Sequence, residues 1–490
     1  MKKGARFLYS LHRITGTVIA LFFLMWFISG LVLIYHRFPR VDKAVQYEKM
    51  ETLPSSLPDI ADYLRQLPDS SKIRKINVRR LQGQTLFTVT TKDGTYTFST
   101  DTLHPLKPVT FDYIQQVARN WVNAPVLKID TLHKREQWIM YSRYVHEMPI
   151  YKFYFDDKEK HQLYIAARSG EVLQFTNSTQ RFWVWVGYIP HTFYIPFLRQ
   201  HTDAWTNTLT VAGIIGLLAG LTGLYFGLSI LCRRYKRKRL IDNPYRKRWY
   251  RWHYILGFVF GVFIVTWGLS GAVSLQRLPR WLIPIEGDYS VSSEKLRGKV
   301  FPANKYVLDY RQLRKAYPDL KAVEWTYYHN LPLYSIITGN RSLMIDASSS
   351  KVKDLFLSEE TVAGAIRKLH GEDVPFHITL IDKYDEYYLS FDNDRPLPVY
   401  KVEVENFDRS VYYIDPTTSH HKYLNTNRKV KKWLFSAFHY LNIRWLVEWH
   451  TLWTISIWTL CLGGAALSLT GVWLGVRYIV RKSRRFIRNS

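Results

Sequence analysis

Six of the 16 histidines in this chain lie at or beside the ends of long apolar segments. His12 begins the first such segment, and His253 begins a later one that matches it at eight of 19 positions. Because imidazole nitrogens are good ligands for transition metals, a histidine that recurs in this way is a candidate metal ligand. Two imidazoles from different helices can also occupy both axial positions of a haem iron. The six histidines form three equivalent pairs: His12 with His253, His191 with His439, and His201 with His450.

Small residues follow the first pair of histidines at helical spacing. In each segment a histidine at position i is followed by small residues at i+4 and i+8, on the same face of a helix. A groove of this kind could receive a flat ligand such as a porphyrin, whereas the alternative is that the small residues only allow close helix packing. The two sets are His12, Gly16 and Ala20, and His253, Gly257 and Gly261.

The segments that carry these residues are long enough to cross a bilayer. They cover about 11–35, 204–231, 254–276 and 450–476, and charged residues are absent after the first three positions of each. The first segment is too long for a signal-peptide core and no A-x-A cleavage pattern follows it, so we expect it to remain in the mature protein. The sequence therefore predicts an α-helical membrane protein with four transmembrane helices.

Basic residues predict the orientation of these helices. The N-terminus, the short loop 232–252 and the C-terminal tail together hold 20 Lys and Arg residues and one Asp, which is +19 of the total net charge of +28. The positive-inside rule then places both termini and the short loop in the cytoplasm. Nucleic-acid binding is a poor explanation for the basic loop, because it directly adjoins two predicted helices.

The chain is a tandem repeat of two halves, each with two predicted membrane helices around a long hydrophilic segment. Equivalent residues differ by 241 in the first helix of each half and by 248 in the second. Both halves cross the membrane in the same direction, so the repeat is parallel and its pseudo-twofold axis runs along the bilayer normal. Residues related by such an axis are candidates to face each other, and His12 and His253 would meet near the cytoplasmic face.

The second pair, on the other face of the membrane, is open to alternatives: His191 with His439, His201 with His450, or a mixed pair. If one helix were continuous from His439 to His450, the two would lie about 16 Å apart on one face, so they could not serve one iron. Trp26 and Trp267 lie deep in equivalent helices, where they either line a cofactor or pack in the core.

The two long hydrophilic segments predict α+β domains. FDYIQQVARNW has helical spacing, whereas KINVRRL, TLFTVTT and TYTFST alternate like half-buried strands. A strand-turn-strand unit occurs at 148–173, 331–352 and 397–419, each time with a Pro at the start of the first strand, and a related unit at 84–102 lacks this Pro.

This strand unit resembles the PepSY repeat, and the whole chain resembles the PepSY-associated transmembrane family. The motifs LHRITG, HTFYIPFL, WHYILG, HYLNI and LTG carry the resemblance, which covers nearly all 490 residues. It implies two periplasmic PepSY-like domains and a bacterial inner-membrane haem protein that reduces ferric siderophores. The expected order is helix 1 with its cytoplasmic N-terminus (1–36), PepSY-like domain (37–180), interfacial helix and helix 2 (181–231), cytoplasmic loop (232–252), helix 3 (253–277), PepSY-like domain (278–430), interfacial helix and helix 4 (431–477), and cytoplasmic tail (478–490).

The expected function is transfer of electrons across the inner membrane to a ferric siderophore in the periplasm, with haem b, and two haems in all, as the cofactor. No nucleotide-binding fingerprint is visible, so the electron donor would be a separate cytoplasmic reductase or a membrane quinol. The first alternative is transport, which the lack of carboxylates, Lys and Arg inside the helices disfavours. The second is a PepSY protein that binds or regulates an envelope peptidase, which leaves the repeated histidines without a role.

Overall fold

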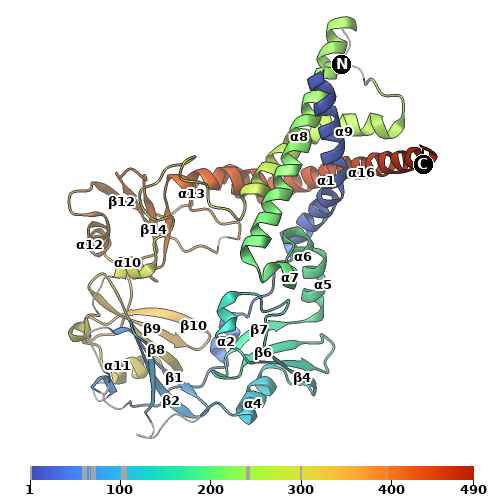
Figure 1. Cartoon of the computed structure of the whole chain (residues 1–490). Helices are drawn as coiled ribbons and strands as arrows, with labels where there is room; N and C mark the ends of the chain where they lie inside the picture. Colours follow the sequence, from blue (N-terminus) through green and yellow to red (C-terminus); the bar gives the residue numbers. More distant parts are fainter. Residues whose placement is uncertain are drawn as a thin grey trace.

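The computed structural model describes residues 3–57, 63–65, 67, 73–100, 108–238, 243–297, 301–392 and 394–489. Four long helices dominate one end of the molecule, and both termini lie at the end of these helices that points away from the sheets (Figure 1). All four are long and apolar enough to cross a membrane, as predicted, and all four extend beyond the apolar segments into basic sequence. They are α1 (Lys3–Tyr35), α8 (Thr202–Lys238), α9 (Arg248–Val273) and α16 (His450–Asn489).

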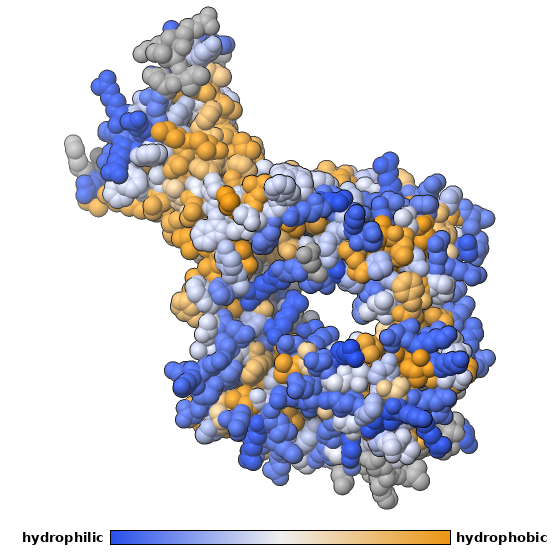
Figure 2. All heavy atoms as spheres, turned by 180° about the vertical axis from the view of Figure 1, so that it is seen from behind, coloured by the Kyte–Doolittle hydropathy of each residue, from blue (hydrophilic) through white to orange (hydrophobic). Residues whose placement is uncertain are grey.

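The four helices form one bundle, in which α1 and α9 each pack against both α8 and α16. Glycines permit the closest approaches: a Cβ added at Gly213 would lie 2.5 Å from the backbone nitrogen of Ala272. The interior is aromatic and aliphatic and includes Phe23, Phe27 and Trp267. The outer faces of these helices expose large apolar side chains, which form a hydrophobic belt in Figure 2, as expected for a surface in contact with lipid.

Short helices join the sheets to α8 and α16 in each half. The residues that end two of these helices, Phe193 and Leu441, are repeat-equivalent, and both have left-handed backbones, with φ of 50° and 54°. No continuous helix therefore runs from His439 to His450, because the chain turns at Leu441. The first-half helices are α5 (Ser178–Val186), α6 (Tyr188–Thr192) and α7 (Pro196–Arg199). Their counterparts are α13 (Thr426–Lys431), the π-helix η4 (Lys432–Ala437), α14 (Phe438–Tyr440) and α15 (Arg444–Glu448).

A seven-stranded sheet joins the two halves outside the bundle. Its order is β11-β10-β9-β8-β1-β2-β3, so that β1 of the first half pairs antiparallel with β8 of the second. Val78 lies opposite Val323 at this junction, and both side chains are fully buried. The strands are β1 (Ile73–Leu81), β2 (Gln84–Thr91), β3 (Thr95–Ser99), β8 (Leu320–Tyr328), β9 (Leu331–Thr338), β10 (Arg341–Asp346) and β11 (Lys353–Asp354).

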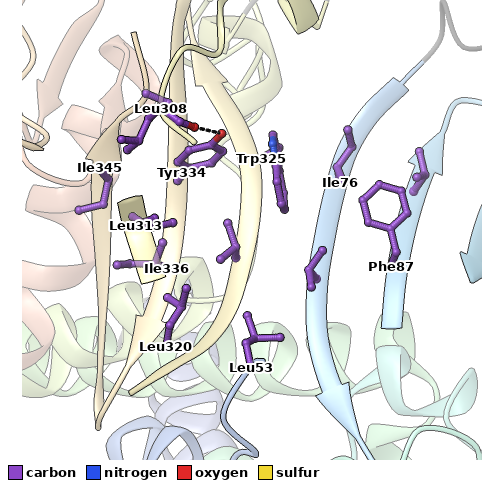
Figure 3. Packing of buried hydrophobic residues seen from close by; sticks show 14 of the residues in the cluster. Leu53, Ile76, Phe87, Leu308, Leu313, Leu320, Trp325, Tyr334, Ile336 and Ile345 are labelled. Carbon is purple, nitrogen blue, oxygen red and sulfur yellow. Dashed lines mark hydrogen bonds between the residues drawn. The ribbon is translucent and has the colours of Figure 1, made fainter. Parts of the chain in front are cut away.

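One hydrophobic core lies against this sheet and takes residues from both halves (Figure 3). Ile76 and Phe87 come from the first half, and Trp325 and Tyr334 from the second. The Tyr334 hydroxyl donates a hydrogen bond of 2.9 Å to the carbonyl of Leu308, so that this buried phenol is satisfied. The two hydrophilic segments thus share a core here, and separating the halves would expose it to water.

Each half also has a four-stranded antiparallel sheet of its own, ordered β4-β5-β6-β7 and β12-β13-β14-β15. The predicted strand units at 148–173 and 397–419 belong to these two sheets, whereas 84–102 and 331–352 belong to the shared sheet. The strands are β4 (Val126–Leu132), β5 (Ile150–Phe155), β6 (Gln162–Ala166), β7 (Val172–Thr176), β12 (Phe376–Ile381), β13 (Val399–Val404), β14 (Val411–Ile414) and β15 (His421–Leu424).

Helices cover the sheets and complete the α+β architecture. The predicted helix FDYIQQVARNW is α4 (Phe111–Trp121), which begins where the Thr110 side chain accepts a hydrogen bond from the Tyr113 amide. α12 (Glu359–His370) is its counterpart in the second half. The remaining described elements are α2 (Lys43–Glu48), η2 (Ser142–Val145), α10 (Ser293–Arg297), η3 (Ala303–Lys305) and α11 (Tyr310–Ala316).

The sheet-bearing part is ring-shaped, and an opening passes through it in Figure 2.

Candidate functional site: two facing histidine pairs

The first site is the terminal-side pair, His12 of α1 and His253 of α9, near the ends of the bundle where the termini lie. Their ring centroids are 6.4 Å apart and the ring planes are inclined by 48°. His12 Nδ1 donates to the carbonyl of Ala219 at 3.0 Å, and His253 Nδ1 donates to the hydroxyl of Thr470 at 2.9 Å. That hydroxyl itself donates to the Leu467 carbonyl, so it must accept from the histidine. Both rings therefore carry their proton on Nδ1 and present the Nε2 lone pair.

A cavity of about 840 Å³ adjoins this pair, and both histidines line it. Gly16 and Gly257 line it too: a Cβ added at Gly16 would meet nothing within 4 Å, and one at Gly257 would meet only Leu467, at 3.8 Å. Of the predicted groove, Gly16 and Gly257 thus face open space, whereas Gly261 serves close helix packing, since a Cβ added there would lie 2.6 Å from Leu224 Cδ2. Its volume lies within the range of cofactor pockets, about 300–1,000 Å³.

Two repeat-equivalent glycines, which also line the cavity, lie against the histidine rings. A Cβ added at Gly223 would lie 2.8 Å from His12 Cε1, and one added at Gly471 would lie 3.7 Å from His253 Cε1. These glycines close the two LTG motifs, whose threonines, Thr222 and Thr470, are within 3.4 and 2.9 Å of the histidine Nδ1 atoms. In each LTG motif the threonine thus lies beside the imidazole Nδ1 and the glycine leaves room for the ring.

The second site is the sheet-side pair, His191 of α6 and His439 of α14, at the end of the bundle nearest the sheets. Their ring centroids are 6.0 Å apart and the planes are inclined by 76°. His191 Nδ1 lies 3.1 Å from the Ser29 hydroxyl and 3.2 Å from the Trp26 carbonyl. His439 Nδ1 lies 3.0 Å from the hydroxyl of Ser270.

The two serines are repeat-equivalent, and each already donates its own hydrogen to a carbonyl three residues earlier on its helix. The serine hydroxyls therefore accept from the imidazoles, as the Thr470 hydroxyl does at the other site. His191 and His439 again carry the proton on Nδ1 and have Nε2 as their free lone pair. Within the described parts of the chain, no hydrogen bond reaches Nε2 in any of the four rings.

The two tryptophans flank the sheet-side pair, but they differ from each other. Trp267 is buried against Phe27, with ring centroids 4.9 Å apart, and its indole nitrogen donates to the His439 carbonyl at 2.8 Å. The indole nitrogen of Trp26 is buried without a hydrogen-bond partner, and the Trp26 ring lies 5.7 Å from that of Phe193. Trp267 thus helps to position His439, whereas Trp26 leaves an unused donor at the same site.

The third predicted pair is not brought together. His201 and His450 are both exposed, and His450 stacks on Trp453 with the ring centroids 5.7 Å apart. Of the alternatives that the sequence leaves open for the sheet-side face, the geometry selects His191 with His439. The cause is the left-handed turn after α6 and α14, which separates His191 and His439 from the long helices that follow.

The geometry of both pairs fits two axial ligands on one metal ion. Two imidazole nitrogens that bind a metal from opposite sides at about 2 Å each hold their ring centroids about 6 Å apart. An imidazole that ligates through Nε2 usually donates its Nδ1 proton to a carbonyl or another acceptor, which fixes the ring. All four histidines have this arrangement, so each pair offers imidazole donors suited to a haem iron. The cavity that could receive a porphyrin adjoins the terminal-side pair.

Sequence reasoning did not assign a role to the hydroxyl and glycine residues that support the histidines. Ser29, Ser270, Thr222 and Thr470 are visible in the alignment of the two halves, together with the histidines themselves. Their recurrence in both halves could have identified them. A polar side chain inside an apolar helix usually has a polar partner, and here the partner is a histidine.

No protein-family model matches the chain, and no curated protein matches it.

Proposed function

We propose that this protein is an inner-membrane b-type haem protein, similar to the PepSY-associated transmembrane family, that passes electrons across the membrane to reduce ferric siderophores in the periplasm. The observation that carries the proposal is the presence of two facing histidine pairs, one at each end of a bundle of four apolar helices. When bound, haem supplies reversible one-electron transfer, which no side chain of the bundle offers.

The spacing of the pairs suits transfer across a membrane. His12 and Ser29, which contacts His191, are 17 residues apart on α1, which is about 26 Å along the helix axis. The hydrocarbon core of a bilayer is about 30 Å thick, so the two sites lie near its opposite faces. Electrons that enter at the terminal side, from a cytoplasmic reductase or a membrane quinol, would leave beside the sheets.

The chemistry of iron release follows from the oxidation state. Siderophore oxygens are hard ligands that bind Fe(III) much more tightly than Fe(II), so one electron weakens the complex. The sheets would hold the ferric siderophore near the sheet-side pair. Both termini and the loop between α8 and α9 would then be cytoplasmic, in agreement with their basic residues.

Absorption spectroscopy tests the cofactor. The protein purified in mild detergent from haem-replete cells should be red, with a Soret band that shifts and sharpens when dithionite is added. Quantification as the pyridine haemochrome should give two haems per chain. A colourless preparation would contradict the proposal and would leave the transport or peptidase-binding alternatives.

Histidine replacement tests the assignment of the ligands. His12→Ala with His253→Ala should remove one haem per chain, and His191→Ala with His439→Ala should remove the other. The matched control, His201→Ala with His450→Ala, should remove neither, because these two side chains are exposed and apart. Retention of both haems by the first two double variants would refute the pairs.

Reoxidation tests the acceptor. Protein reduced with one equivalent of dithionite per haem should be reoxidised by a ferric siderophore while an Fe(II) chelator in the same solution becomes coloured. Chelator colour should fail to develop with the corresponding gallium complex, which cannot accept an electron. Absence of reoxidation by hydroxamate, catecholate and carboxylate siderophores alike would indicate a different acceptor.

A further inference from the structure

The cavity beside the terminal-side pair is lined mainly by apolar side chains together with four arginines. Arg13, Arg233, Arg477 and Arg481 all line it. No Asp or Glu is among the described residues that line the cavity. A cavity with this distribution of charge suits a ligand that is largely apolar and carries negative charge at one edge.

Two of the four arginines are related by the internal repeat. Arg233 on α8 and Arg481 on α16 are separated by 248 positions, the same offset that relates Thr222 to Thr470. Each arginine follows its threonine by 11 residues, which is about 16 Å along the helix. The internal repeat therefore relates these two arginines as it relates Thr222 to Thr470, and both line the cavity, about three helical turns beyond the threonines.

Among the described residues, no carboxylate neutralises the four guanidinium groups. Arg233 donates one hydrogen bond from Nε to the Ser229 carbonyl at 3.0 Å, which leaves its terminal nitrogens available. The Arg13 guanidinium lies 4.3 Å from the centroid of the Tyr478 ring. In the described part of the chain, none of the four makes an ion pair with a carboxylate. Arginine is well suited to bind carboxylates, because its planar fork can donate two parallel hydrogen bonds.

We propose that Arg233 and Arg481 bind the two propionate carboxylates of a haem held by His12 and His253, with Arg13 and Arg477 adding positive charge closer to the iron. This inference rests on the proposed function, and it also fixes how the porphyrin is oriented: its propionate edge points toward the chain termini and its apolar edge points into the bundle. The alternative occupant of the arginines is the headgroup of an anionic lipid.

Haem retention is the measurement. The double variant Arg233→Gln with Arg481→Gln should release haem to excess apomyoglobin about tenfold faster than the wild type, because charge-assisted hydrogen bonds are lost. Only the kinetic phase that is missing in His12→Ala with His253→Ala should change. The matched control, Arg237→Gln with Arg484→Gln, removes the same charge from the same two helices outside the cavity and should leave both phases unchanged.

A second probe tests the carboxylates themselves. Protein produced without haem and then titrated with haem or with haem dimethyl ester should prefer haem about tenfold at the terminal-side pair, and the Arg233/Arg481 double variant should lose this preference. Both measurements are made in phosphatidylcholine vesicles with and without phosphatidylglycerol. An effect seen only with phosphatidylglycerol would overturn the inference in favour of a lipid headgroup.

Failure of the inference differs from failure of the proposed function. A wild-type protein that binds no haem refutes both. A wild-type protein that binds two haems, together with a double variant that releases them at the wild-type rate and discriminates against the ester as before, refutes the arginine assignment alone.

Discussion

At the scale of single residues, hydrogen bonds from Nδ1 fix the ring of each of the four histidines and leave Nε2 as the possible metal ligand. The five acceptors are three hydroxyls and two carbonyls, all on the apolar helices, where a hydrogen bond is stronger than in water. The two histidines of the sheet-side pair differ in their Nδ1 acceptors: His191 has the Ser29 hydroxyl and the Trp26 carbonyl, whereas among the described residues His439 has only the Ser270 hydroxyl.

This inequality predicts different effects of two equivalent substitutions. Ser270→Ala should raise the reduction potential of the sheet-side haem and weaken its binding about tenfold, because an imidazole without an Nδ1 acceptor is a less basic and less fixed ligand. Ser29→Ala should have a clearly smaller effect, since the Trp26 carbonyl remains. Spectroelectrochemical titration of both variants measures this, and equal shifts would contradict the assigned hydrogen bonds.

Gly16 allows a test of the cavity by filling it. Gly16→Leu should abolish binding of the terminal-side haem and leave the sheet-side haem in place, because the new side chain would project into the open space beside His12. Haem quantification and the melting temperature in detergent measure the two effects. A variant that retains both haems with an unchanged spectrum would show that the ligand does not occupy this cavity.

At the scale of elements, β15 contains a half-buried lysine, Lys422, with an unusual environment. Burial is the main cause that lowers the pKa of Lys422 to about 7, and the nearby Arg395 and Arg428 lower it further. Its ammonium group contacts the Tyr387 carbonyl, and Asp385 opposes the shift. The folded sheet therefore favours the neutral amine, in contrast to an unfolded chain, where the pKa of lysine is about 10.4.

A pH dependence of stability follows from this difference. The unfolded chain binds the proton more tightly between pH 7 and 10, so the free energy of unfolding should rise with pH across that window. Lys422→Met should flatten the rise and should be more stable than the wild type below pH 7. Thermal unfolding of the full chain at several pH values measures the slope, and an identical slope in the variant would refute the role of Lys422.

The elements differ in how far the sequence predicts them. The apolar segments predicted four long helices, and the structure confirms four helices able to cross a membrane. Their extensions into basic sequence, such as α16 up to Asn489, were not expected, because hydropathy marks the lipid-facing part of a helix and not its end. A separate interfacial helix before helix 4 was predicted, but its end at Leu441 was not, since a left-handed leucine has no sequence signature comparable to that of glycine.

At the scale of the whole molecule, the two halves are joined by the shared sheet. The sequence predicted strands but not this junction, because pairing between β1 and β8 joins residues about 245 positions apart and leaves no local pattern. A second link is the exposed ion pair between Arg37 and Asp392, at 2.8 Å.

These two links should differ strongly in their contribution to stability. Val323→Asp would bury an unpaired charge at the junction and should destabilise the sheet-bearing part by about 3 kcal/mol or more. Arg37→Ala should change the free energy of unfolding by less than about 0.5 kcal/mol, because exposed ion pairs contribute little. Thermal unfolding of both variants in detergent compares them; a larger effect from Arg37→Ala would reverse this account.

Each histidine pair takes one member from each half: His12 and His191 come from the first, and His253 and His439 from the second. A gene that encoded a single half could therefore build either site only as a twofold homodimer, with assembly limited by protein concentration. Fusion of two copies makes that encounter intramolecular. It also frees the copies to diverge, as the indole nitrogens of Trp26 and Trp267 already have. Because each site contains residues of both halves, divergence between the halves makes each site asymmetric.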